Sequence, residues 1–228
     1  MESFNIIKGN NTNISGNAWA GAGINNHNPS LTGQSVPPRI EPDKPSFLVE
    51  APVTPPLLQG FNSGTIPQDG LSVEPGTYGK LTINGNSTTT LKGGTYYFSA
   101  VDAGRSGLTL RLDLSEGPIT VFITGKVNFS GSVEVSTDGV NWTRINELEH
   151  NTAKELAQKV YWENHGTFTI ATNNSIRQWF GTVLSKQTIT LNSGFYGVGA
   201  FVTTEGNLDI ASNPTVIYSI ADFTRNSW

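Results

Sequence analysis

The chain has 228 residues, enough for one large all-β domain or two small ones. Charged residues make up 14% of it, against about 25% in an average globular protein, and there are 25 glycines. This composition favours a turn-rich β protein and disfavours a helical bundle, whose surface needs lysine, glutamate and arginine. A net charge of −4 and the lack of cysteine exclude an electrostatic nucleic-acid footprint, disulfides, thiolate metal sites and cysteine nucleophiles.

Two features bear on where the protein acts. No stretch approaches the ~18 apolar residues of a membrane helix, so we expect no membrane insertion by this chain. Residues 1–5 do not begin a signal peptide. We interpret this start as one from which a leader or anchor was removed, which predicts an extracellular or cell-surface location; an intracellular protein is the alternative.

Proline is concentrated in one part of the chain, where ten of the 12 prolines lie between Pro29 and Pro75. Because proline cannot donate to a β ladder or continue a helix, residues 34–75 are predicted to form an extended connector. Interleaved apolar residues favour a connector strapped along a surface over a free linker. Residues 1–33 are then predicted to form one or more N-terminal coils, and residues 76–228 the main domain, with a helical insertion at 143–163.

Short segments that alternate apolar and polar residues predict half-buried strands. They are 80–86, 108–114, 118–124, 126–131, 132–135, 166–170, 187–194 and 207–213. Several end in the same serine, asparagine and glycine turn chemistry, and residues 13–17 carry the same unit. Repetition of one strand-turn unit is typical of a β-solenoid, and about 20 residues per coil predicts roughly eight coils. A β-sandwich or jelly roll is the alternative.

One helix is predicted within residues 145–161, where apolar residues fall at helical spacing. Asn146 is expected to cap its start, with Glu149 three residues later as the return partner. The preceding segment, Asp138 to Asn141, predicts a tight turn. The helix is therefore expected to be an insertion between coils that packs its apolar stripe on the side of the solenoid.

The sequence offers little for catalysis. Charged residues at outward strand positions are mostly single, and the three histidines have no metal-ligand spacing. No serine elbow or phosphate-binding glycine loop occurs. We therefore predict no catalytic residues, no cofactor and no metal site.

The outward threonines are the main candidate binding surface. Strand alternation predicts that they point to solvent, and stacked coils would place them in rows about 4.7 Å apart, a spacing suited to an ordered water lattice. High β propensity explains threonine equally well without any ligand. The candidate ice-facing residues are Thr82, Thr109, Thr167, Thr169, Thr188 and Thr190. Trp142, Trp179 or Trp228 would form a sugar platform if exposed.

The C-terminal segment that follows Pro214 is strongly apolar. Val216, Tyr218 and Ile220 are predicted to form the inner face of a last strand. Its free edge would then pair with another molecule, because the exposed ends of a solenoid invite association. The asparagine-rich N-terminus could cap the other end or could pair.

Several segments resemble the signature of bacterial surface β-solenoids. They are VEPGTYG at 73–79, LKGGTYYF at 91–98 and GPITVFITGKVNFSG at 117–131. FGTVLS at 180–185 and ITLNSG at 189–194 resemble the last coils of the ice-binding-protein-like fold. SGNAWA at 15–20 and the proline strap resemble PilX-type pilus-associated proteins.

The resemblance implies a right-handed, three-faced parallel β-solenoid with one α-helix packed on its side. In the ice-binding group the helix usually precedes these coils, whereas here it follows several of them. The expected function is that of a non-enzymatic extracellular solenoid with a structural or adhesive role in a pilus, filament or envelope assembly. An ice-binding protein and a carbohydrate-binding module are the alternatives. The expected partners are further copies of the chain, a glycan or an ice surface.

Overall fold

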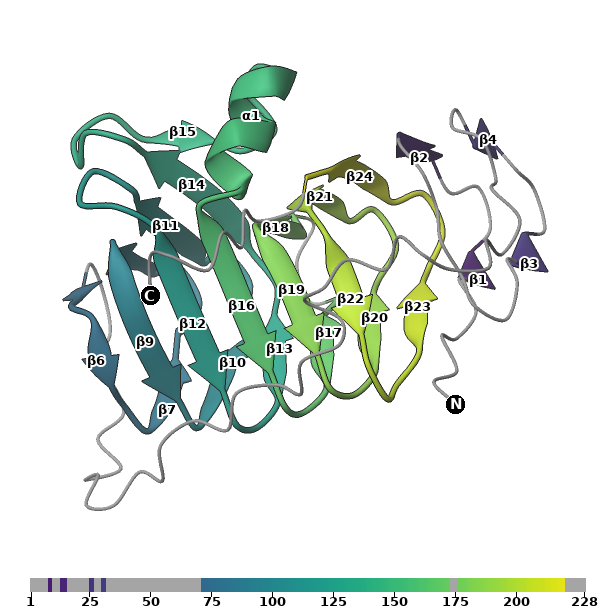
Figure 1. Ribbon diagram of the computed structural model, residues 1–228, viewed down its shortest axis with the longest axis horizontal. Helices are drawn as coiled ribbons and strands as arrows, with labels where there is room; N and C mark the ends of the chain where they lie inside the picture. Colours follow the sequence, from purple (N-terminus) through teal and green to yellow (C-terminus); the bar gives the residue numbers. More distant parts are fainter. Residues whose placement is uncertain are drawn as a thin grey trace, which may run out of the picture.

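The computed structural model describes residues 71–172 and 176–219, together with four short strands between residues 8 and 31. These residues form a β-solenoid of about 7 turns with a single helix (Figure 1). The predicted parallel β-solenoid with one helix is confirmed. A sandwich is excluded because the coils pair in parallel, and the one antiparallel ladder of the described part joins β14 to β15.

Sheet I forms one side of the solenoid and contains eight strands. From one end to the other they are β3 (Asn25–Asn26), β1 (Lys8–Gly9), β23 (Leu208–Ile210), β20 (Ile189–Leu191), β17 (Phe168–Ile170), β13 (Val127–Phe129), β10 (Ala100–Ala103) and β7 (Lys80–Thr82).

Sheet II forms the second side and contains six strands. In the same direction they are β22 (Phe201–Thr203), β19 (Thr182–Ser185), β16 (Val160–Asn164), β12 (Ile119–Ile123), β9 (Gly94–Phe98) and β6 (Gly76–Thr77).

The third side is divided between two sheets of five strands each. Sheet III contains β15 (Thr143–Arg144), β14 (Ser132–Ser136), β11 (Thr109–Asp113), β8 (Thr88–Lys92) and β5 (Leu71–Val73). Sheet IV contains β18 (Gln178–Phe180), β21 (Tyr196–Gly199), β24 (Thr215–Tyr218), β2 (Asn13–Ser15) and β4 (Ser30–Leu31). The chain repeatedly passes from the third side to sheet II and then to sheet I.

A continuous apolar core fills the solenoid, because alternate residues of each strand point inward. Aromatic side chains of neighbouring coils stack in it, for example Tyr78, directly after β6, on Phe98 of β9 with ring centroids 5.6 Å apart. Trp179 is 1% exposed and contacts the rings of Phe129, Trp162 and Phe168. The core aromatics therefore hold successive coils together.

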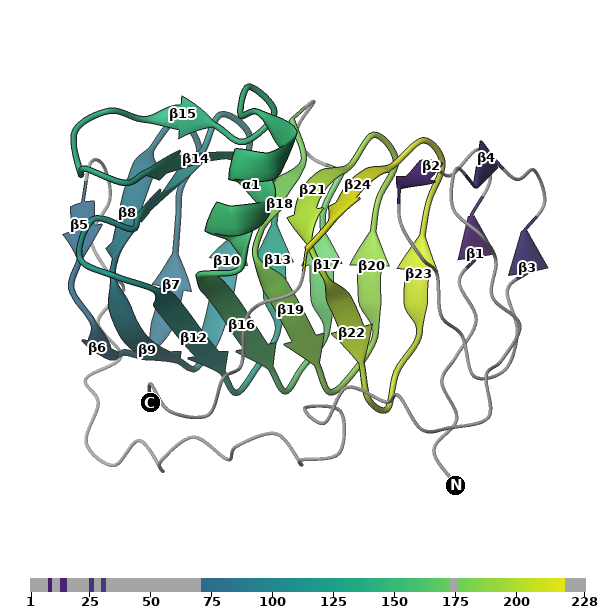
Figure 2. The same cartoon turned by 45° about the horizontal axis from the view of Figure 1, so that its top comes forward.

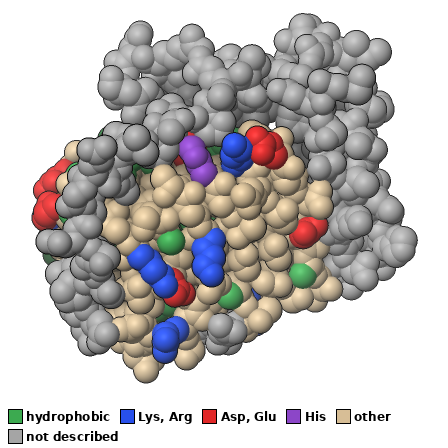
Figure 3. Space-filling view, turned by 90° about the horizontal axis from the view of Figure 1, so that it is seen from below, with side chains coloured by type: hydrophobic (Ala, Val, Ile, Leu, Met, Phe, Trp, Pro, Cys, Tyr) green, Lys and Arg blue, Asp and Glu red, His purple; other side chains and the backbone are tan. Residues whose placement is uncertain are grey.

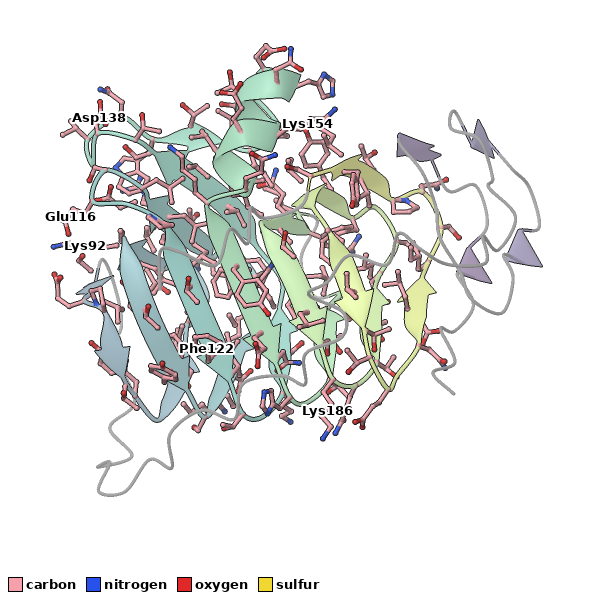
Figure 4. The ribbon with its side chains drawn as sticks, in the orientation of Figure 1. Lys92, Glu116, Phe122, Asp138, Lys154 and Lys186 are labelled. Atoms are coloured by element: carbon pink, nitrogen blue, oxygen red, sulfur yellow. The ribbon has the colours of Figure 1, made fainter. Side chains whose placement is uncertain are left out.

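The insertion after β14 begins with the predicted tight turn (Figures 2 and 4). The Asp138 carboxylate accepts hydrogen bonds from the backbone N–H groups of Asn141 and Val140, at 2.7 and 2.9 Å. These bonds, with Asn141 the largest cause, hold the pKa of Asp138 well below its ordinary value. The chain then returns along β14 as β15.

Helix α1 spans His150–Ala157, which is shorter than predicted. The predicted cap was wrong: Glu149 itself is the N-cap and accepts from the backbone N–H groups of Asn151 and Thr152. Asn146 instead accepts a hydrogen bond from the Gln178 side-chain amide at 2.7 Å. Buried alanines at 153 and 157 lie on the helix, which contacts β21 and β24, so the predicted packing on the side of the solenoid is confirmed.

The N-terminal strands extend the C-terminal end of the solenoid (Figure 2). β1 pairs with β23, and β2 pairs with β24. The predicted N-terminal coils therefore stack on the last coil rather than on the first. At the opposite end, the solenoid begins with β5 at Leu71, inside the range predicted as connector, and residues 34–70 of that prediction lie outside the described residues.

The predicted self-association edge is not free. β24 is hydrogen-bonded to β21 on one side and to β2 on the other. Its predicted inner face was also wrong, because Ile217 is buried whereas Tyr218 is 46% exposed and Val216 is half-buried. The register places Ile217 beside the buried Val198, and this stacking fixes which residues point inward. Ile220 lies outside the described residues.

Candidate functional site

The outward face of sheet I carries a continuous polar row. Its members occupy equivalent positions in six successive coils and are all half-buried. They are Thr82, Asp102, Asn128, Thr169, Thr190 and Asp209. The row places hydroxyl, amide and carboxylate groups at the regular strand spacing of about 4.8 Å.

Four of the predicted threonines form a compact patch on this face. Thr169 and Thr190 are register partners on β17 and β20. Thr167 and Thr188 each lie two residues earlier, so their side chains share the same face. Backbone hydrogen bonds continue the parallel ladder through these positions, with Phe168 N–H donating to the Thr188 carbonyl at 3.0 Å. We call Thr167, Thr169, Thr188 and Thr190 the threonine patch.

The other two predicted threonines do not join the patch. Thr82 lies in the same row, but Asp102 and Asn128 separate it from Thr169. Thr109 is on sheet III, where its hydroxyl hydrogen-bonds that of Ser132 at 2.8 Å. The prediction of one face for all six was therefore wrong, because alternation distinguishes inward from outward but not one side of the solenoid from another.

Charges border the polar row. Lys80 Nζ lies 2.6 Å from the Asp102 carboxylate, and both side chains are partly exposed. The hydrogen bond from Lys80 lowers the pKa of Asp102. Figure 3 views the solenoid from below and shows a broad surface of uncharged polar side chains and backbone with scattered Lys, Arg, Asp and Glu. This surface can offer many weak polar contacts.

Sheet II carries a different cluster on its outward face. The Glu163 carboxylate accepts a hydrogen bond from the Tyr161 hydroxyl at 3.1 Å and lies 3.0 Å from His165 Nε2. Glu163 is only 3% exposed, and burial raises the pKa of its carboxyl. Burial also raises the pKa of Tyr161 far above its ordinary value. We did not predict this cluster, although residues 161, 163 and 165 share one face by strand alternation.

Residues 74–218 match the model of DUF7305, described as a domain of unknown function. The chain belongs to the DUF7305 family. The matched range contains the threonine patch and the Glu163 cluster and leaves out β1 to β5. No curated protein and no solved structure matches this DUF7305 protein.

The described tryptophans of the DUF7305 protein are not arranged as the predicted sugar platform requires. Trp179 is in the core, so it is not available to a sugar. The Trp142 ring is covered by the Arg111 guanidinium, whose carbon lies 4.8 Å from the ring centroid. Arg111 in turn pairs with Glu134 at 2.9 Å. Trp228 lies outside the described residues.

Two further observations concern the described part of this DUF7305 protein. Its His, Asp and Glu residues form no group of three or more that could hold a metal ion. Its helix α1 lacks the length and apolar character needed to cross a membrane.

The raised pKa of Glu163 predicts a specific pH dependence of stability. The folded state binds this proton more tightly than the unfolded state, whose pKa is near 4.5. Glu163 therefore contributes stability that is present below that value and lost as pH rises through the folded pKa. Glu163→Gln should remove this loss, so the variant should gain stability relative to wild type as pH rises. Urea unfolding from acidic to neutral pH measures the difference.

The matched control for Glu163→Gln is Glu116→Gln, because Glu116 is exposed (Figure 4). We expect its unfolding free energy to follow wild type across the pH range. Identical pH profiles for Glu163→Gln and Glu116→Gln would contradict the assignment.

Proposed function

We propose that this protein is a non-enzymatic structural or adhesive solenoid of the bacterial cell surface, with the outward face of sheet I as its contact surface. The observation that carries the proposal is the continuous polar row from Thr82 to Asp209. A rigid ladder of hydrogen-bonding groups at one repeat distance suits a repetitive partner, such as a surface polysaccharide.

The charged side chains also support a structural role. Arg111 pairs with Glu134, Lys92 with Glu74, and Lys186 with Glu205. Each pair joins different coils, so these charges bridge coils instead of converging on one point. Surface pairs of this kind add little to the free energy of folding, and we expect them to act by favouring one stacking register.

A double substitution in the polar row tests the adhesive role. Asn128→Tyr with Thr169→Tyr places two bulky rings on neighbouring strands and should break the flat surface. We expect the variant to bind the polysaccharides that wild type binds on a glycan array at least about tenfold more weakly. A loss of about 1.4 kcal/mol of binding free energy produces a tenfold change in affinity.

Thr90→Tyr on sheet III is the control for the double substitution, because Thr90 is an equally half-buried outward threonine on another side. Its binding should match wild type. Equal loss in both variants, or a wild type that neither binds a glycan nor assembles into filaments by electron microscopy, would overturn the proposal.

The threonine patch favours ice binding as a second candidate function. It presents two rows of two threonines on a flat sheet, although Asn128 and Asp209 border it in the row. Thr167→Tyr with Thr188→Tyr should abolish ice-recrystallisation inhibition and thermal hysteresis if wild type shows them. A wild type without either activity at high concentration would exclude this function.

A further inference from the structure

Sheet II differs from sheet I in the burial of its outward face. In β13, β17 and β20 of sheet I, buried residues alternate strictly with half-buried ones. In β19 of sheet II all four residues are buried. Leu184 is 6% exposed but is not part of the core cluster, whereas its neighbour Val183 is. Because consecutive strand residues point to opposite faces, Leu184 is buried on the outside.

The residues in register with Leu184 form an outward row across sheet II that is largely apolar. Its members are Thr77, Tyr97, Phe122, Glu163, Leu184 and Val202. Tyr97 and Phe122 stack with ring centroids 5.2 Å apart, and Figure 4 places Phe122 on the side of sheet II turned toward the viewer. We call this set the aromatic row. Helix α1 makes its main contacts with β21 and β24 of sheet IV.

The topology requires one segment to travel the whole solenoid. β4 is the last strand at one end of sheet IV, and β5 is the last strand at the other end of sheet III. Residues 32–70 join them. Eight strands of sheet I span about 34 Å, which roughly 11 residues in an extended polyproline conformation would cover. The segment is therefore long enough to follow the surface closely.

The direction of the coils favours sheet II as its path. Five strands of the third side are followed directly by a strand of sheet II, as from β11 to β12 and from β21 to β22, whereas the next described strand after β2 is β3 of sheet I. A chain that leaves β4 in the sense of those five strands emerges toward sheet II. Residues 32–70 contain eight prolines, which need no ladder partner, and interleaved apolar residues, among them Phe47, Leu57 and Leu58.

We propose that residues 32–70 run along the solenoid and dock their apolar side chains on the aromatic row of sheet II. The occupant is this segment of the same chain, and its docking ties the first coil to the last. Residues 220–228 and a second copy of the chain are the competing occupants.

Thiol labelling tests the proposal, because the chain contains no cysteine. Leu184→Cys in the full chain should react with a maleimide at least about tenfold more slowly than Thr190→Cys, which is half-buried on sheet I. Leu57→Asp with Leu58→Asp should then raise the labelling rate of Leu184→Cys about tenfold and leave that of Thr190→Cys unchanged. If Leu184→Cys fails to fold, Val202→Cys probes the same row.

Phe223→Asp distinguishes the occupants. If Phe223→Asp raises the labelling rate of Leu184→Cys and the substitutions at 57 and 58 do not, residues 220–228 cover the aromatic row and the proposal is overturned. Protection that weakens on dilution would identify a second copy and also overturn it. Circular dichroism on each variant establishes that a cysteine whose labelling rate has risen belongs to a folded chain.

Discussion

Replacing Trp179 with alanine should lower the free energy of unfolding by about 3–5 kcal/mol, the usual cost of removing a buried aromatic ring. Its ring centroid lies 4.7 Å from that of Trp162, 4.8 Å from Phe168 and 5.1 Å from Phe129. These three rings belong to β16, β17 and β13, so the resulting cavity would open between successive coils. Urea unfolding followed by far-UV circular dichroism measures the loss.

Trp179→Phe and Trp142→Ala are the controls for this prediction. The Trp179 indole nitrogen has no hydrogen-bond partner within the described residues, so Trp179→Phe removes side-chain volume but no hydrogen bond. We expect this variant to lose about 1–2 kcal/mol of unfolding free energy. Trp142 is half-buried on the surface, and its alanine variant should cost less than the core variant. A Trp179→Ala variant as stable as Trp142→Ala would show that the rings do not pack as described.

Gly181→Ala should destabilise the solenoid by about 3 kcal/mol or more, because it combines backbone strain with a backbone clash. Gly181 has φ +101°, a conformation that other residues rarely adopt. A Cβ atom there would lie 2.6 Å from the Val160 carbonyl oxygen in the coil below. Neither backbone can move without breaking the ladder between β16 and β19. The midpoint of thermal unfolding should fall accordingly.

Gly117→Ala separates the two causes. Gly117 has φ +124°, but a Cβ atom there would have nothing within 4 Å. Gly117→Ala should therefore lower the free energy of unfolding only through backbone strain, by about 1–3 kcal/mol, which is less than the loss for Gly181→Ala. Equal losses at the two positions would show that close coil packing at Gly181 adds nothing.

Strand alternation predicted an all-β chain, and the repeated turn unit favoured a solenoid over a sandwich. The period of two is local, so segments such as 108–114 and 166–170 reveal one buried and one wet face without knowledge of their neighbours. The turn after β14 was also predictable, because Asp138 and Gly139 determine it locally.

The assignment of residues to sides of the solenoid could not be predicted in the same way. Thr109 and Thr169 have the same local pattern but lie on different sheets, because the corner between strands decides the side. The inner face of β24 likewise follows from its register with Val198, which is a contact between coils. The helix start differed because the Glu149 carboxylate, rather than Asn146, reaches the first free N–H groups.

The pairing of β1 and β2 with the last coil has a consequence for protein synthesis. These strands leave the ribosome before the rest of the solenoid, and their partners β23 and β24 are made roughly 200 residues later. At ~5–20 residues per second, the N-terminal residues wait on the order of 10–40 s for those partners. The strands of the solenoid that are translated earliest therefore complete their hydrogen bonds late, and a nascent chain stalled before Leu208 cannot pair β1 with β23.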